Sequence, residues 1–302
     1  MIHANPCKAI AWVFILDLSR MLTYDGQLTK LIVDGLAEDI GDGDHSTLSC
    51  IPGGVRGKAV LKIKDNGILA GIDVAEKVFL FKDASADFKK LMVDGQIIQA
   101  GEIAFEVESS MQTILSVERL VLNIMQRMSG IATLTAKYAD KLSGYKTKLL
   151  DTRKTTPNFR VLEKEAVRIG GGFNHRMGLY DMIMLKDNHI DYAGGLRNAI
   201  EKARAYVQEN NLQLKIEVET RSLEEVAAVM DIGKVDRIML DNFEIAALRD
   251  ALKIIQGRFE TEASGGINLD NIRHFADTGV DFVSVGALIH QAQSLDLSLK
   301  AK

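Results

Sequence analysis

Proline, cysteine and tryptophan are scarce in this chain of 302 residues, which has three prolines, two cysteines and one tryptophan. Cys7 and Cys50 belong to no CxxC pair or Cys/His cluster, so neither a disulfide framework nor a structural zinc site is expected. A chain without disulfides is typical of a reducing compartment, and we expect the cytoplasm. Because prolines are few and no low-complexity run occurs, little of the chain is expected to be a disordered linker.

Long hydrophobic runs are also missing. The apolar run Ala9–Leu16 is too short to cross a bilayer. Asp17 and Arg20 follow it and no A-x-A cleavage site is present, so a secretory signal is not expected either. Residues 1–20 are interpreted as an N-terminal extension, with Met21 as a possible true start of translation. No membrane partner is expected.

The chain as a whole has a negative net charge, but one segment has a positive net charge. The chain has a formal net charge of −4, whereas residues 151–190 contain seven Lys or Arg against five acids, a local charge of +2. A cationic segment around the three glycines 170–172 in an acidic chain predicts a site for a small anion. A nucleic-acid surface would need more positive charge than this. P-loop, GxGxxG, HExxH and GxSxG motifs are absent, so the usual ATP, dinucleotide, zinc-protease and serine-hydrolase sites are not indicated.

Residues 21–115 are predicted to form a smaller α+β domain. Apolar spacing predicts a helix over 27–37, and alternating residues predict a strand over 57–64. Asp73 is a candidate N-cap for a helix over 74–81. Further antiparallel strands are predicted over 88–93 and 102–108, because the intervening Asp-Gly turn favours hairpins.

Residues 116–286 are predicted to form an incomplete (β/α) barrel, so the fold class is α/β. A long helix, which Gly130 could bend, runs from Ser116 to about Gly144. Short apolar runs then alternate with helical segments, which indicates parallel strands covered by helices. These runs are 148–151, 181–186, 214–219, 237–241, 260–264 and 281–285. Most of them end on a charged residue, serine or glycine, and the carboxyl ends of barrel strands converge on one mouth. Six strands are too few for a complete eight-fold barrel.

Charged residues and small residues at these strand ends are the candidate site. Arg153 and Lys154 suit carboxylate or phosphate, although a solvated turn with a structural Asp is an alternative. Glu219 and Asp241 suit Mg²⁺, which uses one or two carboxylates plus substrate phosphates, although structural salt bridges are an alternative. The last two strand ends, Ser264–Gly266 and 284–287, contain small residues that let backbone N–H groups approach a phosphate. Arg119 by itself would be interpreted as a residue of a solvated helix face.

Several segments in this order resemble the quinolinate phosphoribosyltransferase family over residues 27 to 297. They are LAEDIGDGD at 36–44, SVERLVLNIMQRMSGIAT at 116–133, DTRKT, GGGxNHR, LKDNH, LDN, SGG and VGALxH. The resemblance implies an N-terminal α/β domain, an incomplete barrel, and a last segment (287–302) that packs on the first domain. It also implies a homodimer. One departure is Asn158, where many relatives have glycine; asparagine tolerates the same left-handed backbone.

The resemblance also implies the substrates and the residue roles. Quinolinate and phosphoribosyl pyrophosphate would react with Mg²⁺ to give nicotinate mononucleotide, CO₂ and pyrophosphate, a step of NAD biosynthesis. Glu219 and Asp241 would hold the metal and the ribose side, and Lys154 the pyrophosphate. Arg119 would reach the neighbouring subunit's site. The remaining substrate-binding residues would be Thr152, Arg153, His175, Arg176 and Lys186 for quinolinate, and Ser264, Gly265, Gly266, Val285, Gly286 and Ala287 for the 5′-phosphate. The alternatives are a paralogous phosphoribosyltransferase linked to molybdenum transport, another phosphate-binding barrel enzyme such as an isomerase or aldolase, and a non-enzymatic binding barrel.

Overall fold

The computed structural model describes residues 23–302, which divide into two compact units. The first contains the described residues up to Gly130 together with 156–166 and 293–302; the second contains 131–155 and 167–292. The expected boundary at residue 116 does not coincide with this division, because the 31-residue helix α5 (Met111–Lys141) runs through it. The suggested extension 1–20 and the alternative start at Met21 lie outside the described residues.

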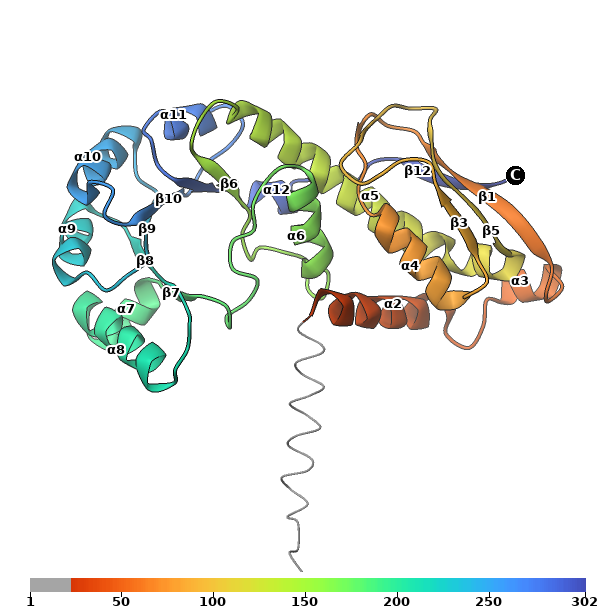
Figure 1. Cartoon of the computed structure of the whole chain (residues 1–302), viewed down its shortest axis with the longest axis horizontal. Coiled ribbons are helices and arrows are strands. Elements are labelled where there is room, and N and C mark those ends of the chain that lie inside the picture. Colours follow the sequence, from red (N-terminus) through yellow and green to blue (C-terminus); the bar gives the residue numbers. More distant parts are fainter. Residues whose placement is uncertain (1–22) are drawn as a thin grey trace, which may run out of the picture. The chain divides into compact units, whose positions relative to one another are not determined.

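An antiparallel sheet forms the centre of the first unit, in the order β12-β1-β5-β3. Its strands are β1 (Arg56–Ile63), β3 (Asp87–Lys90), β5 (Ile103–Ser110) and β12 (Leu297–Ala301). A short pair, β2 (Gly67–Ile68) and β4 (Ile97–Ile98), and the helices α2 (Tyr24–Ile40), α3 (His45–Cys50) and α4 (Ile72–Lys82) complete it. Strand β12 pairs with β1, so the last residues of the chain form an edge of the N-terminal sheet (Figure 1).

Aromatic side chains join α4 to this sheet. The ring of Phe79 on α4 lies 5.8 Å from Phe88 on β3 and 6.2 Å from Phe105 on β5, measured between centroids. Phe79 and Phe105 are completely buried. Offset and edge-on ring pairs of this kind stabilise a core beyond the apolar area that they bury.

The predicted N-cap of α4 is wrong. The helix begins at Ile72, and its N-cap is Gly71, which has a left-handed φ of 101° and no side chain to cap the helix. The Ile72 N–H instead donates to Asp94 Oδ1 at 2.9 Å, while Asp73 forms an ion pair with Lys90. The cap therefore comes from the Asp-Gly turn 22 residues later, which local sequence spacing does not reveal.

Gly130 does not split the long helix, because α5 is continuous through it. A Cβ at this glycine would lie 2.0 Å from the Gln293 carbonyl oxygen, so glycine is needed for close backbone contact with the returning C-terminal segment. The helix begins at Met111 rather than Ser116 and ends at Lys141.

Six parallel strands form the second unit, in the order β6-β11-β10-β9-β8-β7. They are β6 (Lys148–Leu150), β7 (Ile183–Leu185), β8 (Ile216–Thr220), β9 (Arg237–Asp241), β10 (Glu260–Ser264) and β11 (Phe282–Ser284). All six overlap the predicted runs, and β9 and β10 have the same bounds as predicted. Strands β6 and β7 are consecutive in the chain but occupy opposite ends of the sheet, so no β6–β7 ladder closes it. The predicted fold class, an incomplete barrel after a smaller α+β part, is confirmed.

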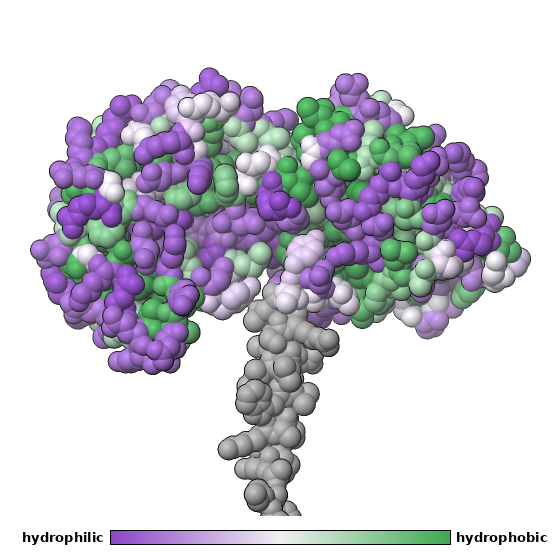
Figure 2. Space-filling model, in the orientation of Figure 1, coloured by the Kyte–Doolittle hydropathy of each residue, from purple (hydrophilic) through white to green (hydrophobic). Residues whose placement is uncertain are grey.

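Helices follow the strands and cover their outer side (Figure 1). They are α7 (Asp187–Ala193), α8 (Leu196–Glu209), α9 (Leu223–Ile232), α10 (Ile245–Ile255), α11 (Ile272–Ala276) and α12 (Ala287–His290), and α6 (Arg160–Ile169) precedes β7. Ser222 caps α9 by accepting from the Glu225 N–H. Among the described residues, none of the helices has the length and hydropathy needed to cross a bilayer. Hydrophilic residues cover most of the second unit on the face in Figure 2.

Candidate active site

A pocket of about 850 Å³ lies at the carboxyl ends of the barrel strands. Its lining residues follow or end all six strands, which is where parallel barrels place their sites. The predicted residues that line it are Thr152, Arg153, Lys154, His175, Arg176, Lys186, Glu219, Asp241, Ser264, Gly265, Gly266, Val285, Gly286 and Ala287. Arg119 is the exception among the predicted residues: it is exposed on α5 in the first unit.

Asp151 anchors the loops that carry the cations of the pocket. Its carboxylate is completely buried; Oδ1 accepts from the His175 N–H at 2.8 Å, and Oδ2 accepts from Asn174 Nδ2 at 2.7 Å. The end of β6 thereby holds the segment 174–176. The acid of the DTRKT motif is thus a structural residue that aligns the basic residues beside it.

Two guanidinium groups lie near one another in the pocket. Burial and the neighbouring Arg153 both lower the pKa of Arg176 from its usual value. The Arg176 Nη1 donates to the Met182 carbonyl at 3.1 Å, which orients the side chain. The buried Nε of Arg153 has no hydrogen-bond partner among the described residues. Neighbouring cations with a buried unused donor fit a ligand with more than one anionic oxygen.

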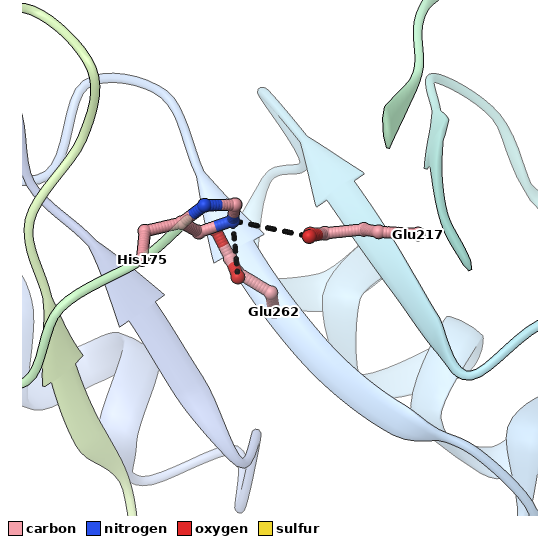
Figure 3. A group of neighbouring side chains, drawn as sticks. All are labelled: His175, Glu217 and Glu262. Atoms are coloured by element: carbon pink, nitrogen blue, oxygen red, sulfur yellow. Dashed lines mark hydrogen bonds and ion pairs between the residues drawn. The ribbon is translucent and has the colours of Figure 1, made fainter. Parts of the chain in front are cut away.

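His175 is held between two buried glutamates (Figure 3). Its Nε2 lies 3.0 Å from Glu217 Oε2 on β8 and 3.5 Å from Glu262 Oε2 on β10. Burial opposes protonation of the ring, but the hydrogen bonds to the two carboxylates outweigh it and raise the pKa of His175 to about 9. When the ring is neutral, Nδ1 accepts from the Arg176 N–H at 2.7 Å and Nε2 carries the proton that faces the glutamates; protonation of Nδ1 breaks this hydrogen bond. Both ring nitrogens therefore have partners within the chain.

The pKa values of Glu217 and Glu262 are shifted in opposite directions. Burial and the charge of Glu262 raise the pKa of Glu217. Burial alone would raise the pKa of Glu262 as well, but its interactions with His175 and Arg237 outweigh burial and lower the pKa below the usual value. Arg237 Nη1 donates to Glu262 Oε2 at 2.9 Å. His175, Glu217 and Glu262 have potential metal-ligand atoms within 4.8 Å of one another. We favour an ion-pair network, because Arg237 and His175 already neutralise the carboxylates.

Carboxylates occupy the neighbouring part of the pocket. Glu219 Oε2 accepts from Lys186 Nζ at 2.6 Å, and Asp241 Oδ2 accepts from Asn242 Nδ2 at 2.7 Å. Each carboxylate has a second oxygen that accepts no hydrogen bond from the described chain. Two carboxylates at the ends of adjacent strands, each with one oxygen available, are the kind of ligands that Mg²⁺ takes when it also binds substrate phosphates.

The glycine turns form the remaining wall. Gly265 and Gly266 have left-handed φ values of 94° and 65°. A Cβ at Gly286 would lie 3.2 Å from Lys154 Cδ and 3.3 Å from His290 Nε2, so this glycine lets a lysine and a histidine approach the turn. Glycine turns beside basic side chains suit a phosphate.

Some lining residues were not identified from the sequence as site residues. Glu262 is the clearest case: strand periodicity places it on the same face as Ser264, two residues later, and this signal could have indicated it. Strand periodicity also places Glu217 on the same face as Glu219, but its contact with His175 depends on the fold. Asn242 and His290 belong to the LDN and VGALxH segments and also line the pocket.

Fold and site together define an α/β-barrel protein with an anion-binding pocket that combines arginines, paired carboxylates and glycine turns. Residues 44–129 match the model of the quinolinate phosphoribosyl transferase N-terminal domain, and residues 131–300 match the C-terminal domain of the same family. The chain belongs to the quinolinate phosphoribosyltransferase family.

Relatives from plants and bacteria agree with this assignment. The chain is 43% identical to the chloroplastic carboxylating nicotinate-nucleotide pyrophosphorylase of Arabidopsis thaliana, over 92% of this chain and 83% of that protein. Among solved structures, NadC from Streptococcus pyogenes superposes with a TM-score of 0.85 at 40% identity, covering 91% of this chain and 97% of that one. Nicotinate-nucleotide pyrophosphorylase from Francisella tularensis also gives a TM-score of 0.85, at 39% identity, over 93% and 98% of the two chains.

Proposed function

We propose that this protein transfers the phosphoribosyl group of phosphoribosyl pyrophosphate to quinolinate with loss of CO₂, giving nicotinate mononucleotide and pyrophosphate. The supporting observation is that one pocket combines groups of two different chemistries. Arg153, Arg176 and Lys186 form a cationic part, whereas Glu219, Asp241 and the glycine turns form a part with carboxylates and backbone amides. The first part suits an aromatic dicarboxylate, and the second suits a sugar phosphate with its metal ion.

The cations would bind and orient quinolinate. A planar guanidinium matches a carboxylate with two hydrogen bonds, and two arginines can therefore hold two carboxylates in fixed directions. The proximity of Arg153 and Arg176 is unfavourable without an anion, and a dicarboxylate relieves it. The His175 ring, held by Glu217 and Glu262, would add positive charge to the wall rather than a further N–H.

The reaction needs no covalent attachment to the enzyme. The pyridine nitrogen attacks C1 of the ribose, and pyrophosphate leaves with the electrons of the C1–O bond. The new pyridinium then accepts the electrons of the bond to the adjacent carboxylate, CO₂ departs, and the ring carbon takes up a proton. Lys154 and the amides of the two glycine turns would stabilise the phosphate charges, because preorganised donors act strongly in an enclosed pocket.

Mg²⁺ is proposed as the cofactor, with Glu219 and Asp241 as its protein ligands. When bound it would neutralise the pyrophosphate leaving group. Lys186 also touches Glu219 at 2.6 Å, so one side chain links the quinolinate part of the pocket to the donor part. This contact would let the occupancy of one part influence the geometry of the other.

A homodimer in which Arg119 completes the neighbouring site is proposed as the functional assembly. The first unit leaves large apolar side chains exposed, among them Phe81 (51%), Val93 (63%) and Ile97 (75%). Apolar side chains at such exposures favour a protein interface. We also propose the cytoplasm as the compartment, since Cys50 is a free thiol. The Arabidopsis relative is named as chloroplastic, so subcellular fractionation of the native protein is the direct test.

One assay tests the proposed reaction. The protein is incubated with quinolinate, phosphoribosyl pyrophosphate and Mg²⁺, and nicotinate mononucleotide and CO₂ are measured. Nicotinate in place of quinolinate is the control; it has one carboxylate and should give no product. Product from nicotinate, or none from quinolinate, would contradict the proposal. The second outcome would favour a paralogous phosphoribosyltransferase or another phosphate-binding barrel enzyme.

A further inference from the structure

Asn242 directly follows Asp241 at the end of β9 and has an unusual backbone. Its φ is 56°, in the left-handed region that asparagine tolerates better than most residues. In this conformation its side chain turns back along the chain, and Nδ2 donates to Asp241 Oδ2 at 2.7 Å. The amide therefore restrains the carboxylate beside it and leaves the other carboxylate oxygen to face a ligand.

The same residue also supports the neighbouring glycine turn. Its backbone N–H donates to the Ser264 carbonyl at 2.8 Å. A Cβ at Gly265 would lie 2.1 Å from Asn242 Oδ1 and 2.6 Å from Cγ, so the asparagine side chain occupies the space that any side chain at 265 would need. Asp241 and Ser264 are paired in the β9–β10 register. Asn242 thus contacts both the carboxylate and the phosphate turn of the donor part.

We propose that Asn242 is a positioning residue that couples the Asp241 carboxylate to the Ser264–Gly266 turn, so that the ribose and the 5′-phosphate of the donor are held in one geometry. This inference rests on the proposed function. Three properties of the residue are required together: tolerance of a left-handed backbone, a side-chain N–H donor, and a length that fits against Gly265. Aspartate keeps the size but replaces the donor with a second carboxylate against Asp241, whereas glycine keeps the backbone and removes the amide.

Asn242→Gly and Asn242→Asp test this role, with Asn211→Gly as the matched control. Asn211 is also an exposed asparagine with a left-handed φ (51°), and it does not line the pocket. For Asn242→Gly we expect the KM for phosphoribosyl pyrophosphate to rise about ten-fold, the effect of one lost hydrogen bond, while the KM for quinolinate stays within about two-fold. For Asn242→Asp the expected rise is larger, because two like charges are adjacent. Asn211→Gly should change neither constant.

Binding measured without turnover separates this inference from the proposed function. Isothermal titration calorimetry of phosphoribosyl pyrophosphate with Mg²⁺, and of ribose 5-phosphate without metal, should show weaker binding to Asn242→Gly than to wild type. Equal donor affinity in the two proteins would overturn the inference, as would an equal loss of affinity for quinolinate. If the wild type binds the donor but does not consume quinolinate, the proposed function is refuted. The comparison of donor binding between wild type and Asn242→Gly would then still decide whether Asn242 positions the donor. A wild type that binds no donor would overturn both.

Discussion

The Nε2 of His175 lies 3.0 Å from the Oε2 of Glu217, and both residues are buried. The pair brings a loop residue that follows three glycines into contact with the second residue of strand β8. It fixes the direction of the segment that continues into Arg176. Removing one member of a buried charged pair leaves the other without compensation, which is more costly than the net strength of the pair suggests.

The first prediction concerns pH. The pKa of His175 is raised to about 9, above the roughly 6.5 of an unfolded histidine. A raised pKa stabilises the fold fully below about pH 6.5, and this stabilisation is lost as the pH rises through about 9. Up to about 3 kcal/mol of unfolding free energy should therefore disappear across this window. Urea unfolding of wild type and His175→Gln between pH 6 and 9.5 measures it, and equal pH slopes in the two proteins would contradict it.

The second prediction concerns the guanidinium pair. Arg176→Ala should raise the KM for quinolinate by one to two orders of magnitude, because a charge-assisted contact contributes about 1.5–3 kcal/mol. The KM for the donor should change little. Arg176→Lys keeps the positive charge but lacks the planar guanidinium that donates two hydrogen bonds to one carboxylate. It is therefore expected to recover only part of the affinity for quinolinate. Steady-state kinetics with each substrate varied in turn would distinguish these effects, and near-normal quinolinate turnover by Arg176→Ala would refute the assignment.

The third prediction concerns the metal. Chelation should abolish turnover and added Mg²⁺ should restore it, because Glu219 and Asp241 offer oxygen ligands suited to that ion. Asp241→Asn and Glu219→Gln should shift the Mg²⁺ dependence of donor binding to higher concentrations. Titration calorimetry at several Mg²⁺ concentrations checks this directly. Donor binding that is independent of Mg²⁺ in wild type would remove the basis for the proposed ligands.

The fourth prediction concerns Arg119. If it completes the neighbouring site, Arg119→Ala and Arg176→Ala should each have little activity alone at quinolinate concentrations near the wild-type KM but recover activity when mixed. In a randomly exchanged dimer about a quarter of the sites would contain both arginines. Activity after mixing, with light scattering to establish the dimer, is the measurement. Failure to recover activity despite proven subunit exchange would place Arg119 outside the partner's site.

The fifth prediction concerns stability. In an ordinary helix Gly→Ala stabilises by about 1 kcal/mol. At Gly130 the added Cβ would lie 2.0 Å from the Gln293 carbonyl, and overpacking of this kind typically costs about 1–3 kcal/mol or more. The net change should therefore be destabilising. Gly53→Ala, where no atom lies within 4 Å, should be close to neutral. Thermal melts of both variants test the difference, and a raised Tm for Gly130→Ala would contradict it.

Much of the second unit could be predicted because its signals are local. The run at 237–241 is short, has three apolar residues at its centre and is followed by a helical segment, and it forms β9 at those residues. Asn158 was expected to adopt a left-handed backbone, and its φ is 62°. The first unit was less predictable, since the cap of α4 comes from Asp94 and a strand of its sheet comes from the far end of the chain.

The sequence by itself determined the alternation of strands and helices, the positive charge of residues 151–190 and the residue types that the pocket needs, because periodicity and side-chain chemistry are properties of the chain. Only the tertiary structure decided which of those groups meet. Glu217 and Glu219 are equivalent in strand periodicity, yet one is buried against His175 and the other contacts Lys186 at the pocket. Asn242 meets Gly265 because β9 and β10 are neighbours in register, and pairing between strands is a long-range property that residue spacing does not contain.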